Sequence, residues 1–492
     1  MNCGAFACKL GAETRSCPPM PHAALVWFRN DLRLSDHPAL QAAVASGLPL
    51  LCLYILDDES PGLRPLGGAS RWRLDRALAA LEGELAQRGA TLYFLLGTAE
   101  TLLPRVAKAA NARIFWSRRY GGAEIALDTR LKKSLREQGL DVHSANASLL
   151  AEPWQITSKA GGAFKVFTPF WRALRPQIDP APPVPAPAQL AGARWPAEAP
   201  PPLPREALDL SPTRPNWAAQ FPDPDAGEAG AQKRLRAFLD QKIASYAAHR
   251  DRLGLDATSG LSAHLHFGEI SPRQIVAAAA PLPGADKFLS ELGWREFSHH
   301  LLYAHPELSW RNFNPRFDAF PFLRDDAALM AWRRGATGYP IVDAGMRELW
   351  TTGFMHNRAR MVVASFLTKH LLIDWREGEN WFWDTLADAD EANNAASWQW
   401  VAGCGADAAP YFRIFNPVLQ GEKFDPEGAY VRRFCPELSR LPATLIHKPW
   451  AAPAAALKHA NIRLGETYPS PIVDHSFARR RALDAFARLD KN

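Results

Sequence analysis

The stretch TTGFMHNRARMVVASFLTKHLLIDWREGENWFWDTLADADEANNAASWQWVAGCGADAAPYFRIF, residues 351–415, joins helical spacing to an unusual set of side chains. Amphipathic helices of soluble proteins usually turn Leu, Val and Ile toward the core. A helical face built of Trp, Arg, Asp and Asn favours a large, flat, polar-rimmed aromatic ligand. The polar members are Asn357, Arg358, Arg360, Asp388, Asp390, Asn393 and Asn394, interleaved with Trp375, Trp381, Trp383, Trp398 and Trp400.

The whole chain has the composition of a soluble globular protein. Of its 492 residues 47% are hydrophobic and 22% charged, and this length suits about two to four domains. Its 17 tryptophans exceed what routine packing needs. The net charge of +6 is compatible with nucleic-acid binding but is too small to demonstrate it.

Cysteine spacing and hydropathy indicate the compartment. The cysteines at 3, 8, 17, 52, 404 and 435 show neither metal-ligand spacing nor a disulfide framework, which suits a reducing cytoplasm. No metal site is expected. Apolar runs stay below the roughly 18 residues of a membrane span, and residues 1–21 are predicted to be a disordered extension rather than a signal peptide.

Residues 22–150 predict an α/β domain. Short apolar runs at 23–29, 49–56, 91–97, 113–118 and 141–146 alternate with helical patterns such as 70–89 and 123–139. This alternation indicates a parallel sheet covered by helices, with ligands at the carboxyl ends of its strands. The first strand is followed by neither a dinucleotide-binding glycine fingerprint nor a P-loop.

The rest of the chain divides at a proline-rich region. Residues 151–228 are predicted to be an interdomain linker, because the run PQIDPAPPVPAPAQLAGARWPAEAPPPLPRE (176–206) cannot hold regular helix or sheet. Residues 229–480 have helical periodicity and predict an all-α domain. A C-terminal tail is assigned to 481–492, although SFARRRALDAFARLDK (476–491) resembles a final basic helix.

Three short motifs are ambiguous when each is considered alone. TSGLS (258–262) offers hydroxyls and backbone N–H groups to an anion, or is a plain N-cap. Glu291 and Arg295 share a helix face, as do Tyr246 and Arg250, and either pair could be a solvated surface pair.

Taken in order, these and further motifs resemble the photolyase and cryptochrome family. The motifs are VWFRNDLRLSDHPAL (26–40), TSGLS (258–262), ELGWREF (291–297), GYPIVDAGMREL (338–349), MHNRARM (355–361), DWREGE (374–379), DADEANNAASWQW (388–400) and DAAPYFRIFNP (407–417). The resemblance implies an N-terminal Rossmann-like α/β domain and a C-terminal helical domain that binds FAD. The chain looks most like the microbial, class I-type enzymes that repair cyclobutane pyrimidine dimers in DNA.

The resemblance also implies which residues hold the FAD. Tyr246 and the 258–262 loop would bind its phosphates, and Arg360 would pair with Asp388 beside the flavin ring. Asn394 would face flavin N5, where a neutral amide tolerates the anionic reduced flavin better than a carboxylate. The implied cofactor set is Tyr246, Thr258, Ser259, Gly260, Leu261, Ser262, Phe288, Glu291, Arg295, Asn357, Arg360, Asp388, Ala389, Asp390 and Asn394.

On the substrate side, the resemblance implies that a dimer flips out of the DNA into a pocket. Excited reduced FAD would donate an electron, the ring would open and the electron would return. The implied catalytic set is Glu291, Asn394, Trp398, Trp375, Trp294, Trp400, Asn357 and Met361, with Trp294 and Trp400 as pocket walls. The implied DNA contacts are Arg250, Glu291, Trp294, Asn357, Arg358, Trp400, Gln420 and Lys423.

The chain departs from the family pattern at the flavin-reducing tryptophans. Trp398 and Trp375 match the first two, but Phe322 stands where the outer one is expected. Phe is much harder to oxidise than Trp, so either photoreduction is impaired or another aromatic completes the route. Candidates are Trp350, Trp381 and Trp383.

Smaller departures surround the site. Ala396 and Ser397 replace a Gly pair, and Phe354 replaces a Trp. For a second, antenna chromophore, Glu124 matches a folate-binding Glu, whereas Ser309 and Trp310 replace that subgroup's Cys-Lys pair. Among the alternatives for the antenna, a folate is favoured over a deazaflavin or no second chromophore.

Three other functions compete with dimer repair. A cryptochrome-type blue-light receptor would bind FAD without repairing DNA. Repair of (6-4) photoproducts is expected to need His where Asn357 and Met361 stand. A flavin oxidoreductase lacks support from any nicotinamide motif. Damaged DNA is therefore the expected partner, and we expect a cytoplasmic, nucleoid-associated monomer.

Overall fold

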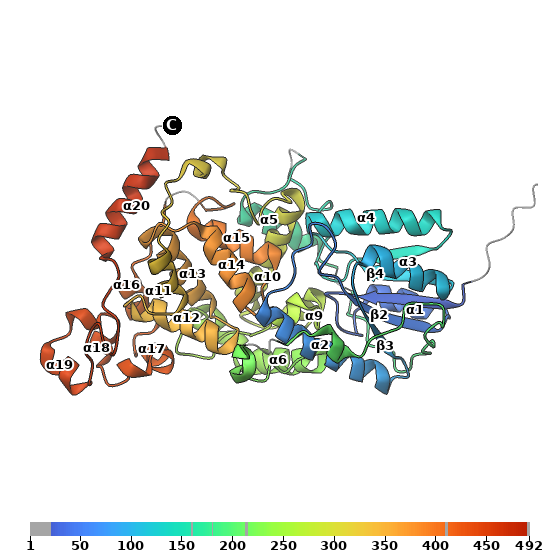
Figure 1. Ribbon diagram of the computed structural model, residues 1–492, viewed down its shortest axis with the longest axis horizontal. Coiled ribbons are helices and arrows are strands. Elements are labelled where there is room, and N and C mark those ends of the chain that lie inside the picture. The colour runs from blue at the N-terminus through green and yellow to red at the C-terminus, as the bar shows by residue number, and fades with distance from the viewer. Residues whose placement is uncertain (1–20, 159–160, 180, 212–214, 409–411, 490–492) are drawn as a thin grey trace, which may run out of the picture.

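The structure is a computed structural model that describes residues 21–158, 161–179, 181–211, 215–408 and 412–489. The predicted extension at 1–21 lies almost entirely outside the described residues. The chain forms an α/β domain and a helical domain that pack side by side, at opposite ends of the long axis in Figure 1. Among the described residues, no helix is both long and apolar enough to cross a bilayer.

The α/β domain contains the five predicted strands. They are β1 (Ala23–Phe28), β2 (Leu50–Leu56), β3 (Leu92–Leu96), β4 (Ala112–Ser117) and β5 (Val142–Ala145). The sheet has the order β3-β2-β1-β4-β5 and is parallel throughout. Strands β1, β2 and β4 are almost wholly buried because helices cover both faces, whereas edge strand β5 is mostly accessible. These helices are α1 (Pro38–Ala45), α2 (Gly68–Gln87), α3 (Ala99–Ala109) and α4 (Gly122–Glu137).

The second domain is helical, as predicted. The helices that build its site are α7 (Tyr246–His249), α8 (Ser262–His266), α10 (Ala285–Ala304), α13 (Asn357–Ser365), α14 (Trp375–Thr385) and α15 (Glu391–Ala402). Around them lie α6 (Glu228–Gln241), α9 (Pro272–Ala279), α11 (Asp326–Arg333), α12 (Pro340–Thr352), α16 (Pro417–Phe424), α17 (Ala429–Phe434), α18 (Ala443–Ile446), α19 (Ala454–His459) and α20 (His475–Leu489). Helix α20 confirms the final basic helix and runs unbroken through residue 481, where the tail is predicted to begin.

The region predicted as a linker has two structurally different parts. Helix α5 (Phe167–Leu174) packs on α10 of the helical domain. The later proline-rich run lies along the α/β domain: the N–H of Leu190 donates to the carbonyl of Arg88 at 2.8 Å, and that of Leu203 to Phe94 in β3 at 2.9 Å. In its described residues this run forms only short 3-10 turns and isolated bridges, as its prolines predict.

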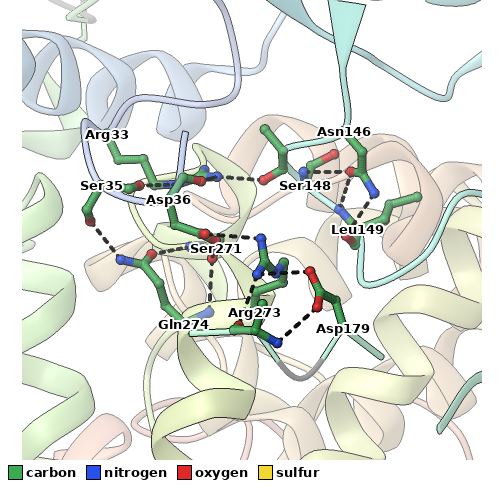
Figure 2. Close-up of polar contacts among 12 residues, drawn as sticks. Arg33, Ser35, Asp36, Asn146, Ser148, Leu149, Asp179, Ser271, Arg273 and Gln274 are labelled. Atoms are coloured by element: carbon green, nitrogen blue, oxygen red, sulfur yellow. Dashed lines mark hydrogen bonds and ion pairs between the residues drawn. The ribbon is translucent and has the colours of Figure 1, made fainter. Parts of the chain in front are cut away.

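A polar seam joins the two domains, and Figure 2 shows part of it. Arg33, only 1% exposed, donates to the carbonyls of Ser35, Asp36, Ala147 and Gly268 at 2.7–3.0 Å. Across the seam the hydroxyl of Ser271 donates to the Asp36 carboxylate at 2.5 Å, and the Gln274 amide donates to the Ser35 hydroxyl at 2.7 Å. Arg273 pairs with Asp36 and Asp179 at 3.3 and 3.2 Å. The domains are therefore joined by specific hydrogen bonds and ion pairs.

Candidate cofactor and substrate site

A cavity of about 330 Å³ lies in the helical domain, between α10, α13, α14 and α15. Most of the predicted residues line it, although they come from segments up to 150 positions apart. Those on its wall are Tyr246, Ser259, Leu261, Ser262, Phe288, Glu291, Trp294, Arg295, Asn357, Arg360, Met361, Asp388, Ala389, Asp390, Asn394 and Trp398. Its size falls in the range of small-molecule and cofactor sites.

The predicted ion pair is present at this cavity. The Arg360 guanidinium donates to both carboxylate oxygens of Asp388, at 2.8 and 3.1 Å. Burial alone would raise the pKa of the Asp388 carboxyl, but Arg360 and a hydrogen bond from Ser262 outweigh burial and lower it. Asp388 therefore stays ionised, and it has its charge partner before any ligand binds.

Two histidines that the motifs did not single out flank Asp390. The side-chain nitrogens of His299 and His266 lie 3.4 and 3.8 Å from the Asp390 carboxylate. Burial opposes ionisation of Asp390, but His299 and His266 hold its pKa well below the usual range. Both ring nitrogens of buried His266 lack a hydrogen-bond partner, and the ring lines the cavity. An unpaired buried imidazole is costly, so it marks a place for a polar ligand atom.

Asn394 is held by a chain of contacts that crosses the domains. Its amide nitrogen donates to the Glu379 carboxylate at 2.8 Å and to the Glu379 carbonyl at 3.0 Å. Arg64 of the α/β domain binds the same carboxylate through two nitrogens, at 2.7 and 2.9 Å. The side-chain NH2 of Asn394 therefore donates its hydrogen bonds to Glu379. The side-chain oxygen remains available to a ligand in the cavity.

Helix α14 shapes the cavity beside Trp398. A Cβ on Gly378 would overlap the Trp398 ring, so only glycine allows the indole to lie this close. Phe382, one turn further along α14, meets Trp398 edge to face at 4.9 Å between ring centroids. Trp375, at the start of α14, is fully buried and donates its indole N–H to Asn312 at 2.9 Å.

Phe322, at the expected outer position, packs on Phe320 at a centroid distance of 4.8 Å. Elsewhere the structure contains a run of three stacked indoles. The rings of Trp381 and Trp350 are 5.9 Å apart and 6° from parallel, and those of Trp350 and Trp217 are 5.0 Å apart at 18°. Trp381 is the neighbour of Phe382 in α14, and the middle ring of the stack, Trp350, is half-exposed.

The substrate-side residues line an adjoining cavity of about 370 Å³ that shares Glu291, Trp294, Asn357 and Met361 with the first. Arg250, Arg358 and Trp400 line only this second cavity. The Glu291 carboxylate is paired with Arg250 and with Lys287, rather than with Arg295. The predicted substrate pocket therefore adjoins the predicted cofactor cavity and shares part of its wall.

A few predicted residues lie elsewhere or turn their polar groups away from the first cavity. Thr258 and Gly260 face a neighbouring hollow on the other side of the 258–262 loop. Arg295 turns its guanidinium toward the α/β domain, where it donates to the Ser148 carbonyl at 2.8 Å. Gln420 and Lys423 lie on α16 and line neither cavity.

A further cavity of about 200 Å³ lies between the domains, at the carboxyl ends of β1, β2 and β4. The strand order reverses between β1 and β4, where parallel α/β sheets usually bind ligands. Glu124 lines this cavity opposite Glu391 of the helical domain. Burial and the Glu124 carboxylate raise the pKa of Glu391 to about 7. Ser309 donates to Glu391 at 2.9 Å, whereas Trp310 is exposed.

The residues of the first cavity fit FAD. Apolar walls from Leu265, Ile275 and Phe382 suit a flat ring, while charged and amide groups gather at the rim. Buried atoms without partners, the His266 nitrogens and the Trp398 indole N–H, offer polar contacts that the protein does not use itself.

Comparison with known proteins identifies the family. Residues 24–188 match the model described as DNA photolyase, and residues 288–488 match the FAD binding domain of DNA photolyase. A deoxyribodipyrimidine photo-lyase of Agrobacterium fabrum is 50% identical and is aligned over 95% of this chain and 98% of its own length. The chain belongs to the DNA photolyase family. Its helical domain is accordingly an FAD-binding domain.

Other members show how wide this family is. Cryptochrome-1 of Arabidopsis thaliana is 39% identical over 95% of the chain and 70% of its own length. A crystal structure of a bacterial class III photolyase from Agrobacterium tumefaciens superposes with a TM-score of 0.91 at 48% identity, over 97% of this chain and 100% of that one. That enzyme carries a different class label from the class I type that the motifs suggested, within the same fold.

Proposed function

We propose that the protein repairs cyclobutane pyrimidine dimers in DNA with light. The observation that carries this proposal is that the two cavities adjoin and share wall residues, among them Glu291, Trp294, Asn357 and Met361. A flipped dimer in the outer cavity would therefore lie close to a cofactor in the inner one. Bound reduced FAD supplies the excited electron that opens the dimer.

The side chains would bind and orient the two partners. Arg360 and Asp388 would fix the charge beside the flavin ring, and the free oxygen of Asn394 would accept a hydrogen bond from the flavin N5–H. Trp294 and Trp400 would form the apolar walls that replace the stacking lost on flipping. Arg250 and Arg358 would contact the DNA backbone, whose phosphates usually dominate affinity.

The test is repair by the reduced holoprotein. Oligothymidine irradiated to form dimers should lose them under blue light and keep them in the dark, as measured by chromatography of the products. Trp400→Ala should weaken binding of dimer-containing DNA by about ten- to hundredfold, because base–aromatic stacking is worth roughly 1–3 kcal/mol. The exposed Trp310 is the matched control, and Trp310→Ala should leave binding unchanged.

The same experiment separates the alternatives. A cryptochrome-type receptor would bind FAD and leave every dimer intact, and the similarity to plant cryptochrome-1 keeps this alternative in view. A (6-4) repair enzyme would restore only (6-4) photoproducts. Neither pattern is compatible with the proposal.

We also propose that Trp381, Trp350 and Trp217 replace the missing outer tryptophan in flavin reduction. Their stacked rings are spaced for stepwise electron transfer, whereas Phe322 is a poor electron donor. Trp350→Phe should therefore slow light-driven reduction of the oxidised holoprotein, followed by absorbance, while Trp310→Phe should not. Unchanged kinetics in both Trp350→Phe and Trp381→Phe would contradict this route.

A second chromophore is proposed for the cavity between the domains, with a folate favoured over a deazaflavin because Glu124 lines it. The purified protein should then show a near-ultraviolet band besides that of flavin, and Glu124→Gln should reduce this band. A flavin spectrum alone would contradict the proposal. We further propose that the protein acts as a monomer, which sedimentation of the holoprotein would test.

A further inference from the structure

An aromatic side chain from the region 151–228 packs against the indole of Trp294. Phe167, at the start of α5, stacks on it with centroids 3.9 Å apart and planes 8° from parallel. Trp171, one turn along α5, extends the stack from Phe167 at 6.5 Å and 9°. Phe167 therefore covers one face of the proposed substrate wall and fixes the tilt of its ring.

The same short segment also reaches the opposite wall. The Trp400 indole N–H donates to the carbonyl of Asp407 at 3.1 Å, and the Asp407 N–H donates to the carbonyl of Lys165 at 3.1 Å. The Asp407 carboxylate in addition accepts a hydrogen bond from the backbone N–H of Phe167. Asp407 has a φ of 56°, a left-handed conformation that a non-glycine residue keeps only when its surroundings hold it.

Trp294 and Trp400 belong to different helices, α10 and α15, so their separation depends on what joins them. Residues 165–167 contact one wall directly and the other through Asp407. They belong to the region 151–228, whose composition indicates a spacer. In the structure α5 instead packs into the same apolar cluster as α10 and α15, which includes Ala392 and Ala395, and Figure 1 shows these helices together.

We propose that residues 165–167 are a brace that sets the spacing and tilt of the two substrate walls. The brace makes the pocket select a rigid fused dimer over a single undamaged base. This inference rests on the proposed repair function and deepens it. Phe167 and Asp407 are thus positioning residues, since they act on the substrate through Trp294 and Trp400.

The test compares two leucine substitutions in α5. Phe167→Leu keeps apolar bulk but loses the flat ring, and it should weaken binding of dimer-containing oligonucleotide by about three- to tenfold, the equivalent of one stacked aromatic contact. Affinity for undamaged DNA and the flavin content should stay the same. Phe170→Leu removes a ring that is more deeply buried and whose ring contacts are with Phe164, Phe297 and His300, so it should not change the ratio of the two affinities. Phe167→Tyr keeps the flat ring, so its ratio of affinities for dimer-containing and undamaged DNA should match that of the wild type.

Asp407 gives an independent pair of variants. Asp407→Asn keeps an acceptor oxygen and tolerates the left-handed backbone, whereas Asp407→Ala loses both advantages. Asp407→Ala should therefore lose more affinity for dimer-containing DNA than Asp407→Asn, again with undamaged DNA as the reference.

Equal affinity ratios for Phe167→Leu and Phe170→Leu would overturn the brace, as would a parallel loss of both affinities in Phe167→Leu. A wild-type holoprotein that leaves dimers intact under blue light would instead overturn the proposed function, and the brace with it. Repair by the wild type therefore distinguishes the two failures.

Discussion

Arg33 and His266 are both buried near the boundary between the two domains, yet they differ in their polar contacts. Each guanidinium nitrogen of Arg33 donates to a backbone carbonyl. Neither ring nitrogen of His266 has a hydrogen-bond partner. Buried polar groups in native proteins are nearly always paired. Arg33 is therefore fully used by structural contacts, whereas His266 keeps ring nitrogens in the cavity wall that a bound ligand could contact.

The largest effect is expected at the seam. Arg33→Met should lower the free energy of unfolding by about 3–5 kcal/mol, because it leaves several buried carbonyl acceptors without a donor and each unsatisfied acceptor costs roughly 1–3 kcal/mol. Urea unfolding of the flavin-free protein would measure this change. Arg105 is exposed on α3, and Arg105→Met should cost less than about 0.5 kcal/mol. A similar small cost for Arg33→Met would show that the seam does not hold the domains together.

The cavity can be distorted by a single methyl group. Gly378→Ala should displace Trp398 and cost about 1–3 kcal/mol from overpacking, with a loss of bound flavin measured from the ratio of flavin to protein absorbance. In α2, a Cβ on exposed Gly83 meets nothing within 4 Å. Gly83→Ala should stabilise the protein by about 0.5–1 kcal/mol through helix propensity. Full flavin content in Gly378→Ala would contradict the placement of Trp398.

A substitution of His266 tests whether a buried group without hydrogen bonds serves ligand binding rather than stability. His266→Leu should change the stability of the flavin-free protein only slightly, because it removes buried ring nitrogens that lack hydrogen bonds but also takes one of two imidazoles away from Asp390. FAD affinity should fall by about tenfold or more, since a hydrogen bond to a charged group is worth roughly 1.5–3 kcal/mol. Titration with FAD would measure the affinity. A large loss of stability with no change in affinity would mean that His266 is structural.

The smallest effect concerns Glu391, whose pKa is raised to about 7 by burial and by Glu124. The folded state then binds its proton more tightly than the unfolded state, so the stability that Glu391 contributes is present below its ordinary pKa and is lost as pH rises through 7. Glu391→Gln should therefore raise the melting temperature by a degree or so at pH 8 and have little effect at pH 5. Glu137→Gln, on the exposed face of α4, should show no such difference between the two pH values.

The α/β fold was predictable because each buried strand is a short apolar run between helical patterns, which local sequence shows directly. The site residues of α13 and α15 were also predictable, since they lie within compact motifs such as MHNRARM. By contrast, Arg64 binds Glu379 across 315 positions, and no local pattern indicates a pair at that distance.

The other differences between the sequence-based predictions and the structure also arise from contacts between residues far apart in the sequence. Glu291 and Arg295 share a helix face, but Arg250, the residue that follows α7, competes for the carboxylate and pairs with it. The aromatic residues of α5 could be read as part of a linker because their partner, Trp294, comes about 120 positions later. Tertiary contacts of this kind decide which of several locally reasonable partners a side chain takes.

The hydrogen bond between Leu203 and Phe94 has a consequence for solubility. Strand β3 is an edge of the sheet, and an open edge is a template on which a second chain can pair. Leu203 stands in PPPLP, between prolines that have no N–H to donate, so it satisfies one acceptor of β3 and cannot start a sixth strand. The proline-rich run thus closes the edge against intermolecular pairing, and a fragment cut at residue 150 would expose that edge and tend to aggregate.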